Sequence, residues 1–432
     1  MVKNRVDIIS LGCSKNLVDS EKLMRQLEVQ GYTVCHNPDK VKGEVVVINT
    51  CGFIGDAKEE SVNMILEVCQ EKARGHIRKV FVMGCLSERY RNELEDEVPE
   101  VDRYFGKFDW PDLLTELGKV YDADLSAQRT LTTPSHYTYV KIAEGCNRHC
   151  SYCAIPIITG HYVSRCMEDI VAETEWLVTQ GVKEIQLIAQ DLTYYGMDLY
   201  HRPCIAELVE RIADIPGVEW IRLHYGYPTD FPADLLRVIR ERPNVCNYLD
   251  LALQHISDPM LANMHRHITA EETRKLLERI RHEVPGIVLR TTMMVGFPGE
   301  TDEDFEKLKQ FVREMRFERM GAFAYSEEEG TWAAKNLVDD VPEDVKQQRL
   351  DELMALQQEI AGEVSASFVG RELKIIVDRV EGNYYIGRTE YDSPEVDPEV
   401  LVPKQLCDMK IGCFYHVRIT DTDDFDLYAE PV

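Results

Sequence analysis

From Thr138 onward, β-type runs alternate with amphipathic helical stretches for six rounds, and this alternation limits the possible folds more than any other feature. The predicted strands are Tyr139–Ile142, Glu184–Ala189, Trp220–His224, Tyr248–Leu253, Ile287–Val295 and Met320–Tyr325. The helical stretches between them are Met167–Gln180, Ile205–Ala213, Ala233–Glu241, Ala270–Glu283 and Asp302–Met315. Six strand–helix units in series predict a partly closed parallel barrel, with functional side chains at the carboxyl ends of its strands.

A shorter alternation of the same kind occupies the first hundred residues. Val6–Gly12, Glu44–Thr50 and Lys79–Gly84 read as buried strands, and helices are predicted from about Asp19 to Gln30 and from about Asp56 to Lys72. Strand–helix–strand order at this spacing implies a parallel sheet with helices on its faces. The sequence therefore predicts a separate N-terminal α/β domain.

The remaining segments divide the chain into three domains. Tyr121–Pro134 is polar and lacks a pattern, so it is predicted to link the two α/β domains. A long amphipathic helix is expected after Pro342, and Phe368–Val432 changes to short β-type runs separated by turn signals, which fits a small β-barrel. The predicted fold is therefore α/β with a terminal β-barrel, and the predicted domains are residues 1–125, 135–365 and 366–432.

Composition restricts the cellular compartment and the kind of partner that we expect for the chain. No stretch approaches the roughly 20 apolar residues that span a bilayer, and the first residues lack the apolar core of a signal peptide. We therefore expect a cytoplasmic protein without a membrane partner. In that reducing compartment, the 13 cysteines are expected to be metal ligands, reactive thiols or core residues rather than disulfides. The net charge of −27 argues against generic nucleic-acid binding and favours a basic partner.

The run EGCNRHCSYCAIP carries the clearest chemical signal. Its cysteines, Cys146, Cys150 and Cys153, follow the first predicted barrel strand, where a barrel's functional site is expected. Three thiolates at this spacing can hold a four-iron–four-sulfur cluster and leave one iron open to a substrate. A zinc site is the alternative, but it needs a fourth ligand from His149 or from a distant residue.

A second set of three cysteines is spread along the N-terminal domain. Cys13, Cys51 and Cys85 each follow one of its three predicted strands directly. Parallel strands end at the same edge of a sheet, beside the crevice where ligands bind, so the three thiols predict a second cluster with an open iron. The other seven cysteines show no such pattern and are predicted to fill the core: Cys35, Cys69, Cys166, Cys204, Cys246, Cys407 and Cys413.

These motifs resemble a known family. The three-cysteine loop resembles the signature of radical S-adenosylmethionine enzymes. Its combination with the N-terminal cysteines and a TRAM-like barrel resembles the methylthiotransferases over essentially the whole chain. The closest resemblance is to the branch that modifies an aspartate in the twelfth small-subunit ribosomal protein, on these runs: LGCSKNLVDSE, NTCGFIGDAKEES, KIAEGCNRHCSYCAIP, IRLHYGYP, TTMMVGFPGET and YIGRTEYDSPEVD. The sibling branch, which modifies transfer RNA, typically has Gln-Met-Asn where this chain has Ser14-Lys15-Asn16.

The resemblance implies two [4Fe-4S] clusters and S-adenosylmethionine as cofactors, with an external electron donor. The cluster on the barrel loop would bind S-adenosylmethionine and cleave it to methionine and a 5′-deoxyadenosyl radical. The auxiliary cluster on the N-terminal cysteines would carry the sulfur. One S-adenosylmethionine would methylate that sulfur, and a second would supply the radical that removes hydrogen from the β-carbon of the aspartate.

Further cofactor contacts are expected around the barrel strands. Tyr152 is placed to pack on the adenine, and Arg290 could pair with the methionine carboxylate. Glycines in the run Gly296–Glu300 would let the backbone approach the nucleoside closely. The predicted cofactor-binding residues are Tyr152, Gln190, Asp191, Gln254, Arg290, Gly296 and Glu300.

The terminal barrel favours a protein substrate over RNA. Residues 366–432 hold 7 Lys and Arg against 14 Asp and Glu, so this domain would repel phosphates and attract a basic chain such as a ribosomal protein. The acidic runs Glu390–Glu399 and Asp421–Asp426 are the expected attractants. Two alternatives stay open, namely modification of adenosine in transfer RNA and a non-catalytic electron carrier with two clusters.

Overall fold

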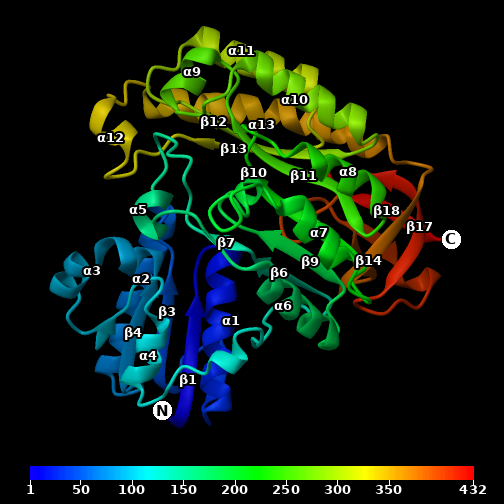
Figure 1. The fold of residues 1–432 in the computed structure, drawn as a ribbon. Coiled ribbons are helices and arrows are strands. Elements are labelled where there is room, and N and C mark those ends of the chain that lie inside the picture. The colour runs from blue at the N-terminus through cyan, green and yellow to red at the C-terminus, as the bar shows by residue number, and fades with distance from the viewer.

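The computed structural model describes residues 1–432 and contains three β-sheet bodies joined in a row (Figure 1). The N-terminal body is an all-parallel sheet in the order β2-β1-β3-β4-β5. Its elements are β1 (Val2–Ser10), α1 (Ser14–Val29), β2 (Thr33–His36), β3 (Gly43–Thr50), α2 (Gly55–Ala73), β4 (Lys79–Gly84), α3 (Cys85–Glu97), β5 (Arg103–Tyr104) and α4 (Trp110–Glu116). The chain reverses direction across the sheet between β1 and β3, and ligands bind beyond the strand ends at such a point.

The central body is a six-stranded parallel sheet in the order β13-β12-β11-β10-β9-β6. Its strands are β6 (Tyr137–Lys141), β9 (Glu184–Ile188), β10 (Trp220–Gly226), β11 (Val245–Gln254), β12 (Val288–Val295) and β13 (Arg319–Ala324). The helices between them are α6 (Met167–Thr179), α7 (Ile205–Ala213), α8 (Ala233–Glu241), α9 (Asp258–Asn263), α10 (Ala270–Glu283) and α11 (Asp302–Met315). The predicted partial barrel is confirmed.

Local sequence explains the helix starts in this body. Thr269 and Thr301 begin α10 and α11 with capping boxes, in which the threonine side chain accepts from a backbone N–H that has no partner within the helix. The apolar faces of these helices cover strands that are themselves buried, so the largest core of the molecule, 47 residues, lies in this body. Parallel sheets covered on both faces have this composition.

The cysteine loop and the outer strands of the central sheet are covered by shorter elements and by neighbouring helices. A small hairpin, β7 (Ala143–Glu144) with β8 (Val163–Ser164), and α5 (Ile155–Thr159) flank the loop, and α12 (Trp332–Asn336) lies after β13. Helix α1 of the N-terminal body contacts β6, while the long helix α13 (Glu343–Ala366) contacts β13. Both outer strands therefore have a helix beside them (Figure 1).

The C-terminal body is a closed five-stranded barrel in the order β14-β15-β16-β18-β17. Its strands are β14 (Glu372–Glu381), β15 (Tyr384–Thr389), β16 (Val400–Pro403), β17 (Phe414–Thr422) and β18 (Leu427–Pro431). The three bodies fall within the three predicted domain ranges, whose boundaries stay predictions. No helix in the structure has both the length and the apolar character that a membrane crossing requires.

Sequence patterns missed the two short strands of the N-terminal sheet. β2 is half-exposed, and β5 has only two residues, so neither produces an apolar run. The predicted linker also makes buried contacts, although its polar sequence suggests an exposed segment. Arg129 is fully buried beneath β6, where it donates to Thr138 Oγ1 at 3.2 Å and to the Tyr139 carbonyl.

Candidate functional site

Cys13, Cys51 and Cys85 lie at the carboxyl edge of the N-terminal sheet, as the sequence predicts. Cys13 and Cys51 follow β1 and β3, the two strands at the reversal point, and Cys85 begins α3 directly after β4. Burial raises the pKa of Cys51, and it raises the pKa of Cys85 to about 12, with smaller contributions from the neighbouring cysteines of the set. The three thiols are therefore close enough to influence one another.

Backbone geometry holds this set together. Gly12 has a φ of +84°, and a Cβ at this position would lie 2.7 Å from Cys51 Cβ and 2.9 Å from its Sγ. Only glycine lets the β1 loop pass this close to Cys51. The Ser61 hydroxyl accepts from the Cys51 N–H and donates to the Cys51 carbonyl, both at 3.0 Å, which fixes the loop after β3.

Asn16 connects the same edge to its surroundings. Its amide nitrogen donates to the Thr50 carbonyl at 3.0 Å, and its Oδ1 lies 3.5 Å from Cys85 Sγ. The Lys107 ammonium donates to that same Oδ1 at 3.3 Å. Asn16 and Lys107 were missed from sequence, because neither belongs to a pattern that predicts a ligand site.

Cys146, Cys150 and Cys153 lie on the loop after β6, at the carboxyl end of the central sheet. Ser151 anchors the loop: its N–H donates to the Met264 carbonyl at 3.0 Å, and its hydroxyl donates to the Asn263 carbonyl at 2.7 Å. Burial raises the pKa of Cys146 to about 11 and that of Cys153 higher still. Metal binding must deprotonate such thiols.

Three side chains that the sequence did not single out surround Cys150. Arg266 donates to Cys150 Sγ at 3.2 Å, and the Tyr227 hydroxyl lies 3.7 Å from the same sulfur. The guanidinium groups of Arg148 and Arg266 lie over the Tyr227 ring, 4.3 and 4.1 Å from its centroid. Arg148 belongs to the loop itself, whereas Tyr227 and Arg266 come from two other segments and reach the loop only in the folded chain.

The predicted cofactor contacts at the strand ends have specific partners. Asp191 accepts from Arg148 Nε at 2.6 Å and from the Thr193 hydroxyl at 2.6 Å. Gln190 donates to Glu144 at 3.1 Å, and its Oε1 is buried without a partner. Gln254 is half-buried at the end of β11 with a φ of +74°. These side chains lie near the cysteine loop, and their binding roles stay predictions.

Tyr152 lies beside the cysteines, within an apolar cluster. Its ring packs edge-on against Phe297 at 6.3 Å, and its hydroxyl accepts from Arg266 at 3.3 Å. Phe297 belongs to the run Gly296–Glu300, so this contact joins the cysteine loop to the end of β12. The contact with adenine stays a prediction.

The structure assigns Gly296 and Glu300 to internal packing. A Cβ on Gly296 would lie 2.3 Å from Lys346 Cγ, so the missing side chain makes room for α13 rather than for a nucleoside. Glu300 is fully buried, where it accepts from the Gly296 N–H at 2.5 Å, from His255 at 3.0 Å and from Arg349 at 2.8 Å. Both of its carboxylate oxygens have partners within the protein, and its contact with a cofactor stays a prediction.

Arg290 is likewise placed away from the cysteines. It lies near the start of β12, paired in register with Asp250 and Arg319, and its guanidinium forms an ion pair with Asp397 of the C-terminal barrel. The expected pairing with a methionine carboxylate is wrong for this arrangement, because the residue lies toward the opposite end of the strand.

The C-terminal barrel closes the amino end of the central sheet through buried ion pairs. Arg388 contacts Glu184 at 2.7 Å, Arg222 contacts Glu184 at 3.0 Å, and Arg319 contacts Asp392 at 2.6 Å. Asp392 and Asp397 belong to the acidic run that was expected to attract a substrate, and both are buried here. That expectation is wrong for these two carboxylates.

A buried cluster of four charges joins the carboxyl end of the central sheet to the N-terminal body. Lys141 contacts Glu144 at 2.5 Å and also pairs with Asp19 of α1. Lys107 lies 3.3 Å from Asp19 and 3.7 Å from Glu144. We call these four residues, Asp19, Lys107, Lys141 and Glu144, the interdomain latch. Glu144 lies two residues before Cys146, so the latch joins the N-terminal body to the central body beside the cysteine loop.

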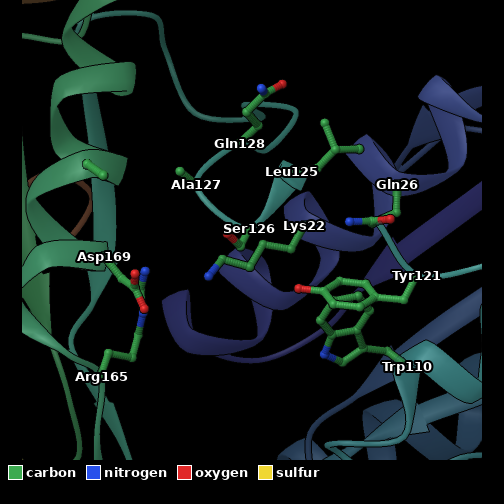
Figure 2. Close-up of a pocket in the computed structure, with 11 residues that line it drawn as sticks. Lys22, Gln26, Trp110, Tyr121, Leu125, Ser126, Ala127, Gln128, Arg165 and Asp169 are labelled. Carbon is green, nitrogen blue, oxygen red and sulfur yellow. The ribbon is translucent and has the colours of Figure 1, made fainter. Parts of the chain in front are cut away.

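A pocket of about 190 Å³ lies elsewhere in the seam between these two bodies (Figure 2). The rings of Trp110 and Tyr121 meet edge-on at 5.2 Å on one side, and Arg165 and Asp169 face them from the other. Burial lowers the pKa of Lys22, which points into this space, to about 8. No predicted site residue lines the pocket.

The structure does not arrange any three His, Cys, Asp or Glu side chains as a metal site. The donor set nevertheless fits two clusters, because each set presents three thiols and no closed fourth ligand. Buried polar atoms without partners, Gln190 Oε1 and Arg266 Nε, lie beside the barrel loop, where a ligand could satisfy them. All 13 cysteines are free, and of the seven predicted core residues only Cys69, Cys204 and Cys246 are buried.

Comparison with known proteins gives the class first. Residues 140–312 match the radical SAM superfamily, residues 5–106 match the uncharacterized family UPF0004, and residues 369–432 match the TRAM domain. The fold is similar to that of the radical S-adenosylmethionine methyltransferase TsrM from Kitasatospora setae, with a TM-score of 0.54 and 16% identity over 75% of both chains. The chain is thus a radical SAM protein with two flanking domains.

Full-length relatives then define the family. The chain is 65% identical to a protein of Phocaeicola vulgatus over 99% of both chains. It is 64% identical to one of Bacteroides thetaiotaomicron over 100% of this chain and 99% of that one. Both relatives are named ribosomal protein uS12 methylthiotransferase RimO. The chain belongs to the RimO family of radical SAM methylthiotransferases.

Proposed function

We propose that this chain transfers a methylthio group to the β-carbon of an aspartate in ribosomal protein uS12, using two molecules of S-adenosylmethionine for each product. The observation that carries the proposal is the pair of cysteine sets at the carboxyl ends of two parallel sheets, whose domains are joined by the buried latch. The names of the full-length relatives support the same reaction.

Each set has a distinct role in the proposal. Cys146, Cys150 and Cys153 would hold the cluster that binds S-adenosylmethionine, and Cys13, Cys51 and Cys85 would hold the auxiliary cluster. When bound, these groups supply one-electron cleavage of the sulfonium and the sulfur for transfer.

The surrounding residues position the barrel loop. Arg266 holds the Cys150 side chain by its contact with Sγ at 3.2 Å, and Arg148 ties the loop to Asp191 at the end of β9. The latch keeps water out of the seam beside the two sets, because Lys107 and Lys141 expose only 3% and 8% of their side chains.

We propose that a basic protein approaches over the exposed acidic hairpin of the C-terminal barrel. Asp423 and Asp424 are exposed between β17 and β18, next to Phe425, which is 47% exposed, and Asp421 is exposed near the end of β17. The surplus of acidic residues in this barrel opposes RNA and favours a basic chain. Free cysteines and a ribosomal substrate fit a reaction in the cytoplasm with an external electron donor.

An anaerobic assay with reductant, sulfide, S-adenosylmethionine and uS12 tests the proposal. Intact mass and fragmentation should locate one methylthio group on an aspartate. C85A is the matched control, since it should still form 5′-deoxyadenosine but no methylthio product. No mass gain on uS12 would contradict the proposal. Modified adenosine in transfer RNA would favour the sibling reaction, and absence of S-adenosylmethionine cleavage would favour an electron carrier.

A further inference from the structure

Lys107 occupies the fourth strand end at the carboxyl edge of the N-terminal sheet. The cysteines of the auxiliary set follow β1, β3 and β4, and Lys107 follows β5, the next strand in the sheet order. Its backbone N–H donates to Glu88 Oε2 at 2.9 Å, and only 3% of its side chain is exposed. The sheet therefore places a buried amine beside three thiols.

Three side chains lie next to the Lys107 ammonium. It donates to Asn16 Oδ1 and Asp19 Oδ2, each at 3.3 Å, and lies 3.7 Å from Glu144 Oε1. The same Asn16 oxygen lies 3.5 Å from Cys85 Sγ, so one amide joins the ammonium to the cysteine. Burial lowers the pKa of Lys107, but Asp19, Glu144, Cys85 and Cys13 outweigh it and raise the value above the ordinary one.

Holding the two domains together does not account for this arrangement. Lys141 already pairs with both carboxylates of the latch, Asp19 and Glu144, from the central domain. Lys107 is the second cation on the same two carboxylates, and unlike Lys141 it also donates to Asn16, whose Oδ1 lies 3.5 Å from Cys85 Sγ. A buried cation this close to the cysteines attracts the negative charge of an iron–sulfur cluster.

We propose that Lys107 is a positioning residue that raises the reduction potential of the auxiliary cluster by holding one fixed positive charge beside its cysteines. The inference rests on the proposed function, since it requires that cluster. Reduction adds one negative charge to a cluster, and a buried cation nearby stabilises that charge more strongly than a solvated one would. The auxiliary cluster would then accept an electron more readily than its burial alone allows.

The test uses the full chain with Cys146, Cys150 and Cys153 changed to alanine, so that only the auxiliary cluster titrates. Potentiometric titration followed by electron paramagnetic resonance reads its potential without requiring turnover. K107Q should lower the equilibrium constant for reduction by at least about tenfold, which is about 59 mV for a one-electron couple. K107R should restore most of the difference. K141Q removes the latch cation that makes no contact with Asn16, so it should shift the potential less than K107Q does.

An unchanged potential in K107Q, or an equal shift in K141Q, overturns the inference. Iron is counted first in the chain with all cysteines intact, where about eight atoms are expected for two clusters. About four atoms would contradict the auxiliary cluster, whereas eight atoms with no shift contradict only the role of Lys107. If K107Q loses iron, D19N replaces it: removing a negative charge beside the Lys107 ammonium should raise the potential, and an unchanged potential overturns the inference.

Discussion

The two ends of the central sheet are both covered by another domain through buried charges, yet they differ in what their buried polar groups lie beside. At the amino end, Arg388 and Arg222 share Glu184, and Arg319 pairs with Asp392. At the carboxyl end, Gln190 Oε1 and Arg266 Nε remain buried without partners beside the cysteine loop. The amino end also leaves His136 Nδ1 and Gln357 Oε1 unpaired, but only the unpaired atoms at the carboxyl end lie beside three thiols that could hold a ligand.

The sharpest test of this contrast removes a thiol at the carboxyl end. C150A should lower formation of 5′-deoxyadenosine by more than about a thousandfold, because two ligands cannot keep the cluster that binds S-adenosylmethionine. Anaerobic turnover followed by chromatography measures the loss. C166A, at the start of α6 in the same domain, should behave as the unaltered chain. Comparable losses in both variants would contradict the assignment of the ligands.

Stability should respond most strongly at the amino end. E184Q leaves Arg388 and Arg222 without their shared buried carboxylate and should lower the free energy of unfolding by about 3–5 kcal/mol. Both arginines hold the pKa of Glu184 below its ordinary value against the opposing effect of burial, so this stabilisation should fade as the pH falls below about 4.5. Urea unfolding measures the change. A loss of S-adenosylmethionine cleavage in the folded fraction would show that the two ends are coupled.

A substitution at Arg290 distinguishes a structural role at the amino end of the central sheet from cofactor binding at its carboxyl end. R290M should leave the KM for S-adenosylmethionine unchanged and lower the free energy of unfolding by about 2 kcal/mol, because it removes the partner of buried Asp397. D397N should have a similar effect on stability. A tenfold rise in KM with normal stability would instead restore the methionine carboxylate as the partner of Arg290.

The smallest expected effect concerns Lys22, in the seam between the N-terminal and central bodies and away from both ends of the central sheet. Burial lowers the pKa of Lys22 to about 8, so the charged form opposes folding at pH 7. K22M should raise the free energy of unfolding by about 1 kcal/mol at pH 7, since Glu173 keeps its contact with Arg165 at 2.6 Å. The gain should shrink above pH 8, where the folded state already holds the neutral amine. K40M, at an exposed lysine, should change nothing at either pH.

The main strands, and the cysteines that follow three of them, could be predicted from sequence because they follow from local patterns. The six barrel strands and the cysteine positions after β1, β3 and β4 appear where apolar runs end. Local patterns do not show toward which end of its strand a side chain makes its contacts. Arg290 was assigned to the cofactor because its strand was known, but only the packing of the C-terminal barrel shows which end it serves.

Residues brought together from distant segments could not be predicted either. Arg266 and Tyr227 reach Cys150 from different turns of the barrel, and their spacing in the sequence carries no signal. Lys107 follows a two-residue strand that has no apolar run to reveal it. The acidic run Glu390–Glu399 of the terminal barrel looks like a surface feature in the sequence, yet two of its five carboxylates, Asp392 and Asp397, pair with arginines of the central domain.

The contacts of α1 with β6 and of α13 with β13 bear on how the protein avoids aggregation. A sheet of six strands does not close on itself, so each outer strand has backbone N–H and C=O groups that could pair with another molecule. Helix α1 of the N-terminal domain lies beside one outer strand, β6, and helix α13, which leads to the terminal barrel, lies beside the other, β13. Expressing the central domain alone would expose both outer strands and favour strand pairing between copies. The flanking segments therefore protect the central sheet from intermolecular pairing during folding.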